Sequence, residues 1–144
     1  MKSQDKQIDV RIKSIKEIEK KIEIKDLPQG DLSLELRLGV HTERKEENDL
    51  VIALKLLCLY QNNPIISYAV AYTFTFEHIE EVFNFSDVIE DKVGVLSTMV
   101  GMTIGGLRGM LAIRLQETPY SHIILPYINP QMLIDNIKKG EPME

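Results

Sequence analysis

The sequence has a single cysteine, no excess of positive charge and no long unbroken apolar run. Cys58 alone cannot form an intrachain disulfide or a zinc site, and the leucines around it indicate a small buried apolar side chain. The longest uncharged stretch, residues 56–76, is interrupted by the turn residues Gln61-Asn62-Asn63-Pro64, and the uncharged stretch Val93 to Leu107 is shorter than the about 20 residues that cross a bilayer. The beginning of the chain has no apolar signal region either, so we expect a soluble, cytoplasmic protein without membrane insertion.

The formal net charge is −5, which opposes binding to nucleic-acid phosphates unless a basic face is segregated, and no such face is evident. Acidic residues gather instead between residues 77 and 91. One interpretation is a solvated connection, and the other is an acidic surface that docks a basic partner. The second interpretation makes Glu77, Glu80 and Glu81 the docking residues.

A chain of 144 residues is long enough for one domain with one core, which we assign to residues 1–144. Its first half alternates between strand patterns and turns. Residues 8–24 fit either a strand or a helix, and their many β-branched residues favour a strand with a bulge near Ser14 to Ile18. After a turn at 27–31, strands are expected at 32–40, 50–60 and 65–76, with a charged hairpin loop at 41–49 and a short turn at 61–64.

The last of these strands places its aromatic residues on one side, which must be buried against another layer. Helical spacing follows, from about Val88 to Glu117, and Thr118-Pro119 ends it. An extended apolar segment, 120–129, then leads to Asn129-Pro130, typical of a helix start, and to a short helix reaching Lys139. The expected fold class is therefore α+β: a four-stranded antiparallel meander covered by a long helix and a short C-terminal helix.

Three glycines are spaced four residues apart on one face of the long helix. Each costs up to about 1 kcal/mol in a helix interior, so close approach of another backbone should compensate. Packing within the domain and packing between subunits are both open. As an oligomer interface, the stripe consists of Gly101, Gly105 and Gly109.

The search for catalytic and metal-binding motifs is unproductive. The histidines, His41, His78 and His122, have neither the i, i+4 spacing nor the Cys or carboxylate neighbours of a metal site. Gly105-Gly106 lacks the strand and the Lys-Ser/Thr of a phosphate-binding loop. We therefore expect no catalytic residue, no metal and no cofactor.

The C-terminal third resembles the protein-export chaperone SecB. The resemblance rests on an Arg on the helix, a turn with small and aromatic residues, an extended apolar piece and an Ile-Asn pair that opens a short helix. Here these are Arg108, Thr118-Pro119-Tyr120, residues 123–129 and the helix bearing Leu133. The chain is thus similar to SecB or to a SecB-like paralogue, including the type that serves toxin–antitoxin pairs.

This resemblance implies an ATP-independent holdase, a tetramer built as a dimer of dimers, that binds non-native polypeptides in apolar grooves. It also implies a translocation motor ATPase, or a toxin–antitoxin pair, as a further partner. Met-rich and aromatic grooves gain roughly 25 cal/mol per Å² covered without requiring one client sequence. The candidate polypeptide-binding residues are Tyr68, Tyr72, Phe74, Phe76, Phe83, Ile123, Leu125, Met132, Leu133 and Ile134. For each of them, an ordinary core position is the competing interpretation.

The alternative function is a non-catalytic module that binds a small apolar ligand on the same fold. It predicts one enclosed apolar pocket per subunit, whereas a polypeptide binder should present an open groove. An enzyme is the third possibility and would need two of the histidines, or a histidine and a carboxylate, within one cleft.

Overall fold

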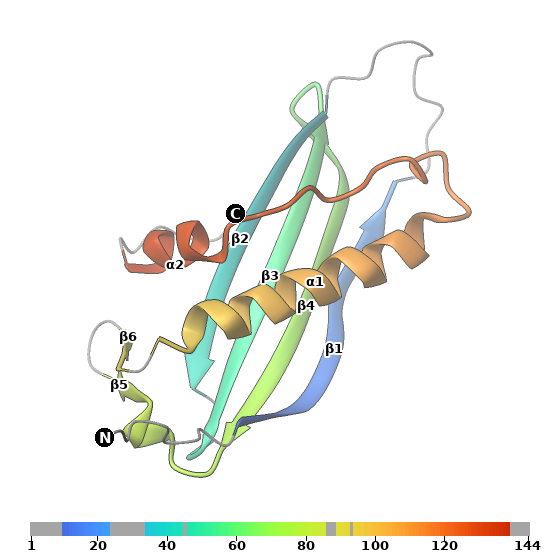
Figure 1. The fold of residues 1–144 in the computed structure, drawn as a ribbon. Coiled ribbons are helices and arrows are strands. Elements are labelled where there is room, and N and C mark those ends of the chain that lie inside the picture. The colour runs from blue at the N-terminus through green and yellow to red at the C-terminus, as the bar shows by residue number, and fades with distance from the viewer. Residues whose placement is uncertain (1–9, 24–33, 45, 86–88, 93, 139–144) are drawn as a thin grey trace.

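The computed structural model describes residues 10–23, 34–44, 46–85, 89–92 and 94–138. A four-stranded antiparallel sheet carries a long helix and a short C-terminal helix on one face (Figure 1), which confirms the expected α+β class. The turn expected at 27–31 lies outside the described residues. The elements are β1 (Val10–Ile22), β2 (Leu34–Arg44), β3 (Asp49–Tyr60), β4 (Asn63–Phe76), the 3-10 helix η1 (Ile79–Glu81), β5 (Phe83–Phe85), β6 (Ile89–Asp91), α1 (Leu96–Leu115) and α2 (Pro130–Lys138).

The sheet order is β1-β4-β3-β2, so only β2, β3 and β4 form a meander of consecutive strands. β1 pairs with β4 rather than with β2, from Val10 opposite Phe76 to Ile22 opposite Ile66. The reason lies in side-chain burial. β4 buries residues on both faces and needs a neighbour at each edge, whereas the many exposed charged residues of β1 suit the outside of the sheet.

The strand interpretation of the N-terminal segment is confirmed, and so is its irregularity. The register of β1 against β4 shifts between Ile12 and Ser14 and again between Glu17 and Glu19. A bulge inserts one residue and changes which side chains share a face, which explains why neither a pure two-residue period nor a helical period describes this segment.

The turn between β3 and β4 is a two-residue connection. Gln61 and Asn62 both have positive φ, 52° and 66°, as the favoured tight hairpin turns require. The preceding hairpin is shorter than expected, because β2 continues through His41 to Arg44 instead of ending at Val40. Arg44 lies opposite Leu50 on β3, so the charged residues at 41–44 still belong to the ladder.

The long helix begins at Leu96 and not near Val88. Gly94 has a φ of 77°, a left-handed conformation that separates α1 from the preceding chain. The carboxylate of Asp91 accepts hydrogen bonds from the backbone N–H groups of Gly94 and Leu96, at 2.8 and 2.7 Å, and thereby satisfies donors at the start of the helix. The segment before it forms the two-stranded β5–β6 hairpin.

The core lies between the sheet and α1. It contains the side chains at alternate positions of β3 and β4, including the aromatic series of β4 that needed a cover, and one side of α1 from Leu96 to Leu115. Burial raises the pKa of the Cys58 thiol to about 11, in agreement with the core position inferred from its neighbours. Among the described residues, α1 is the one helix long and apolar enough to cross a membrane, and in this fold its buried residues pack on the sheet.

After α1 the chain returns across the same face of the sheet to α2, which lies beside β2 (Figure 1). We call residues 116–129 the crossover. α2 begins as the sequence predicted, since the Asn129 side chain accepts a hydrogen bond from the N–H of Gln131 at 2.9 Å. Leu133 and Ile134 on α2 join the core.

Candidate peptide-binding surface

Most of the candidate polypeptide-binding residues lie inside the core. Met132 is exposed, with 63% of its surface accessible, and the others are buried. The buried ones are Tyr68, Tyr72, Phe74 and Phe76 on β4, Phe83 on β5, Ile123 and Leu125 in the crossover, and Leu133 and Ile134 on α2. In this conformation of the subunit, a client could therefore reach only Met132 from the predicted set.

Two further large apolar residues close to Met132 in the sequence, which were not predicted, are exposed as well. Ile124 is 74% exposed and Tyr127 is 81% exposed, and both belong to the crossover. We call Ile124, Tyr127 and Met132 the crossover strip. The signal was the extended run 123–125, in which alternate side chains must point to opposite sides. Ile123 and Leu125 are buried and Ile124 between them is exposed, which leaves a large apolar side chain of the crossover open to solvent.

Polar contacts hold the crossover in place at both ends. The Tyr120 hydroxyl donates a hydrogen bond to the backbone oxygen of Glu23, beyond the end of β1. Arg108, on α1, donates from Nε to the Leu125 carbonyl at 3.0 Å and from its terminal nitrogen to the Pro126 carbonyl at 2.9 Å. Residues 123–129 are neither helix nor strand, so Arg108 satisfies carbonyls that no sheet ladder reaches.

The glycine stripe of α1 has two different environments. A side chain at Gly101 would contact the Pro130 ring at 3.4 Å, so this position packs against α2. At Gly105 and Gly109 an added Cβ would meet nothing within 4 Å. Both are exposed, between the exposed apolar residues Met102 and Ile113. Packing within the subunit thus accounts for Gly101 but not for the other two.

A polar cluster joins β1 to the end of α1. Arg114 contacts the Glu17 carboxylate with two nitrogens, at 2.8 and 3.0 Å, and the buried Tyr68 hydroxyl donates to the same carboxylate. Hydrogen bonds from Arg114 and then Tyr68 lower the pKa of Glu17. Burial, and then Glu17, raise the pKa of Tyr68, which keeps its hydroxyl protonated as the donor.

The free energy of unfolding of the subunit should therefore decrease at acid pH. The pKa of Glu17 is lowered on folding from its ordinary 4.5, so its stabilisation is complete above that value and is lost as the pH falls through the folded-state value. We expect Glu17→Gln to reduce the free energy of unfolding at neutral pH and to flatten its decline between about pH 5 and pH 2. Urea unfolding across that range measures both effects. Glu46→Gln, at a mostly exposed carboxylate, is the control, and an equal acid slope in the two variants would contradict the prediction.

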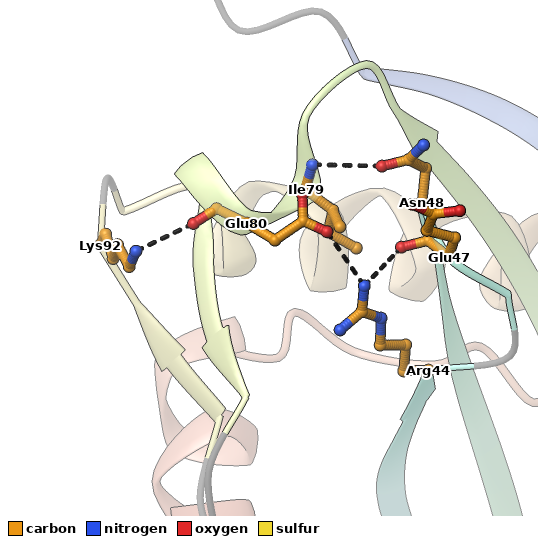
Figure 2. Close-up of polar contacts among 6 residues, drawn as sticks. All are labelled: Arg44, Glu47, Asn48, Ile79, Glu80 and Lys92. Atoms are coloured by element: carbon orange, nitrogen blue, oxygen red, sulfur yellow. Dashed lines mark hydrogen bonds and ion pairs between the residues drawn. The ribbon is translucent and has the colours of Figure 1, made fainter.

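The predicted docking carboxylates already have contacts within the subunit, and Figure 2 shows those of Glu80. Arg44 lies 3.1 Å from the Glu80 carboxylate and also donates to the backbone oxygen of Glu47, while Lys92 donates to the backbone oxygen of Glu80. The Arg44–Glu80 contact joins η1 to the β2–β3 hairpin, and the Lys92 contact joins η1 to the segment after β6. The Arg44 guanidinium also stacks over Phe85 at 4.5 Å. Glu77 is 3.7 Å from His78, and Glu81 also has an interaction partner. Docking at this surface stays a prediction.

The structure does not place the histidines in one cleft. His41 lies on β2, His122 lies in the crossover, and His78 with its neighbour Glu77 is well exposed. Among the described side chains, no group of three His, Cys, Asp or Glu residues could hold a metal ion. A pocket of about 430 Å³ at the end of β4 is lined by Arg11, Thr75, Phe76 and Glu77. Two charged side chains make this pocket unsuited to the apolar ligand of the alternative function.

Comparison with known proteins finds similarity at the level of structure. No model of a protein family matches the chain, and no curated protein matches it by sequence. Among solved structures, a SecB-like chaperone of Mycobacterium tuberculosis, in complex with a ChAD peptide from the HigA1 antitoxin, superposes with a TM-score of 0.57. The match covers 83% of this chain and 89% of that one, at 11% sequence identity. The chain has the SecB-like fold.

The SecB-like fold agrees with the order of elements expected from the sequence. In this fold the crossover connects the two helices over the sheet, and Arg108 on the first helix binds to that connection. At 11% identity the similarity establishes architecture, and the function of this chain is argued from its own surface.

Proposed function

We propose that the protein is an ATP-independent chaperone that binds non-native polypeptides, and that the crossover strip is its first point of contact. The supporting observation is the exposure of three large apolar side chains, Ile124 and Tyr127 in the crossover and Met132 in the first turn of α2. Non-native chains expose apolar side chains that such a surface can cover without demanding one sequence. The structural neighbour of the same fold binds a peptide, which supports a polypeptide as the partner.

The same proposal includes self-association through the outer side of α1. Met102, Gly105, Gly109 and Ile113 follow i, i+3, i+7, i+11 spacing and form one uncharged, exposed stripe. Glycine at an exposed helix position lowers the stability of the helix, and no contact inside the subunit compensates for this at Gly105 and Gly109. Close packing against a second copy would compensate. A cytoplasmic tetramer, built as a dimer of dimers, is the proposed assembly, with export preproteins or antitoxins as clients.

A client assay tests the polypeptide-binding proposal. The purified protein should suppress aggregation of reduced insulin at stoichiometric ratio without ATP. Serine at all three positions of the crossover strip should weaken binding about tenfold or more, because the apolar area available to the client is lost. Absence of suppression by the folded wild-type protein would refute the proposal.

The matched control removes the same number of exposed apolar side chains elsewhere. Ile12, Ile15 and Ile18 on β1 are 41%, 48% and 54% exposed, and serine at these three positions leaves the crossover unchanged. We expect this control to retain client binding, with oligomeric state measured for both variants by light scattering. Equal loss in both triple variants would indicate adsorption to any apolar surface and not a site on the crossover.

A further inference from the structure

The crossover has both buried and exposed large apolar side chains. Ile123 and Leu125 are buried beneath it, while Ile124 and Tyr127 face solvent. On α2, Leu133 and Ile134 are buried while Met132 is exposed. If the crossover and α2 moved away from the sheet, these four buried side chains would be added to the crossover strip.

Besides the burial of these side chains and the hydrogen bond from the Tyr120 hydroxyl to the Glu23 carbonyl, few specific interactions oppose such a movement. Residues 123–129 take part in no strand ladder, and Pro126 has no N–H to donate. The crossover is fixed to α1 by the two hydrogen bonds from Arg108 to consecutive carbonyls. Hydrogen bonds from a charged donor are stronger than neutral ones, and the planar guanidinium fits two oxygens at once.

Arg108 is half-buried on α1, and its two hydrogen bonds are made to backbone carbonyls. The other arginine near the end of the same helix, Arg114, instead pairs with Glu17 on β1. The two arginines therefore fasten α1 to different segments, one to the crossover and one to the sheet edge.

We propose that Arg108 is a latch that holds the crossover closed and thereby limits the apolar surface that the subunit offers to a polypeptide. This inference rests on the proposed chaperone function and adds a positioning residue to it. A client that binds best to the open crossover has its apparent affinity reduced by the fraction of subunits that are open. Releasing the latch should then tighten client binding, whereas a merely structural role for Arg108 would weaken it.

Hydrogen exchange of the full-length protein without client tests the latch directly. In Arg108→Gln the amides of residues 121–134 should exchange about tenfold faster than in the wild type, with β3 unchanged. Arg114→Gln is the matched control, since it removes the same charge from the same helix and should leave crossover exchange as it is. Arg108→Lys, which can still donate to one carbonyl, should lie between wild type and Arg108→Gln. Unchanged crossover exchange in Arg108→Gln would overturn the latch.

Binding of reduced, carboxymethylated α-lactalbumin, a permanently unfolded client, tests what the latch does. We expect its dissociation constant to fall about threefold to tenfold in Arg108→Gln, less in Arg108→Lys, and not at all in Arg114→Gln. Faster exchange with unchanged or weaker binding would overturn the regulatory role. Failure of every variant and of the wild type to bind would refute the proposed function, and the exchange comparison would still decide whether Arg108 holds the crossover.

Discussion

Leucine at position 105 is expected to leave the subunit folded and to separate the copies that we propose pack along α1. An added side chain at Gly105 meets nothing within 4 Å in the subunit, and replacing a helical glycine recovers up to about 1 kcal/mol. A loss of assembly would therefore come from the interface alone. Light scattering gives the oligomeric state, and thermal unfolding at matched concentration gives the stability.

The neighbouring glycine provides the contrast. A side chain at Gly106 would overlap the ring and hydroxyl of Tyr72, which is buried on β4. Overpacking of this kind costs about 1–3 kcal/mol or more, so Gly106→Leu should destabilise or unfold the subunit. If Gly105→Leu keeps the oligomer of the wild type, the exposed glycines are not an interface. A fully stable Gly106→Leu would show that Tyr72 can move aside.

Alanine at position 83 is expected to cost about 3–5 kcal/mol of unfolding free energy. Phe83 is buried, with its ring edge-on to that of Phe76 at a centroid distance of 5.5 Å, and it anchors the β5–β6 hairpin to the sheet. Any loss of client binding in Phe83→Ala should accompany unfolding, as for a core residue. Urea unfolding followed by circular dichroism provides the measurement.

Tyr127→Ala is the comparison that separates core from surface. Because Tyr127 is exposed, its removal should change stability by no more than about 0.5 kcal/mol while weakening client binding. The opposite pattern, a stable Phe83→Ala with reduced binding, would return Phe83 to the polypeptide-binding residues predicted from the sequence.

Local chemistry made much of the fold predictable. Strict alternation on β2 and the aromatic side of β4 each point to a strand with one buried face, and Asn129-Pro130 carries its own helix-start signal. The start of α1 was predicted several residues too early because residues 88–93 continue the apolar spacing. The helix begins only at Leu96 because Gly94 is left-handed and Asp91 accepts hydrogen bonds from the first N–H groups. A hydropathy pattern contains neither signal.

The candidate surface was harder to predict, because exposure is decided by neighbours distant in the sequence. Ile123 and Ile124 have the same side chain, yet only Ile123 is covered. The adjacent glycines 105 and 106 likewise differ only in what faces them, solvent in one case and Tyr72 in the other. Composition and spacing pointed to an apolar segment in the C-terminal third, and the packing of that segment on the rest of the subunit determines which of its side chains are exposed.

The pairing of β1 with β4 sets an order of events during synthesis. Val10 pairs with Phe76, which is synthesised 66 residues later. At about 5–20 residues per second, about 3–13 s of translation separate the two residues. Over that interval the first strand leaves the ribosome without its only ladder partner among the described strands. Its closely spaced lysines then keep a nascent, β-prone segment from pairing with other chains, before the same residues become the rim of a finished sheet.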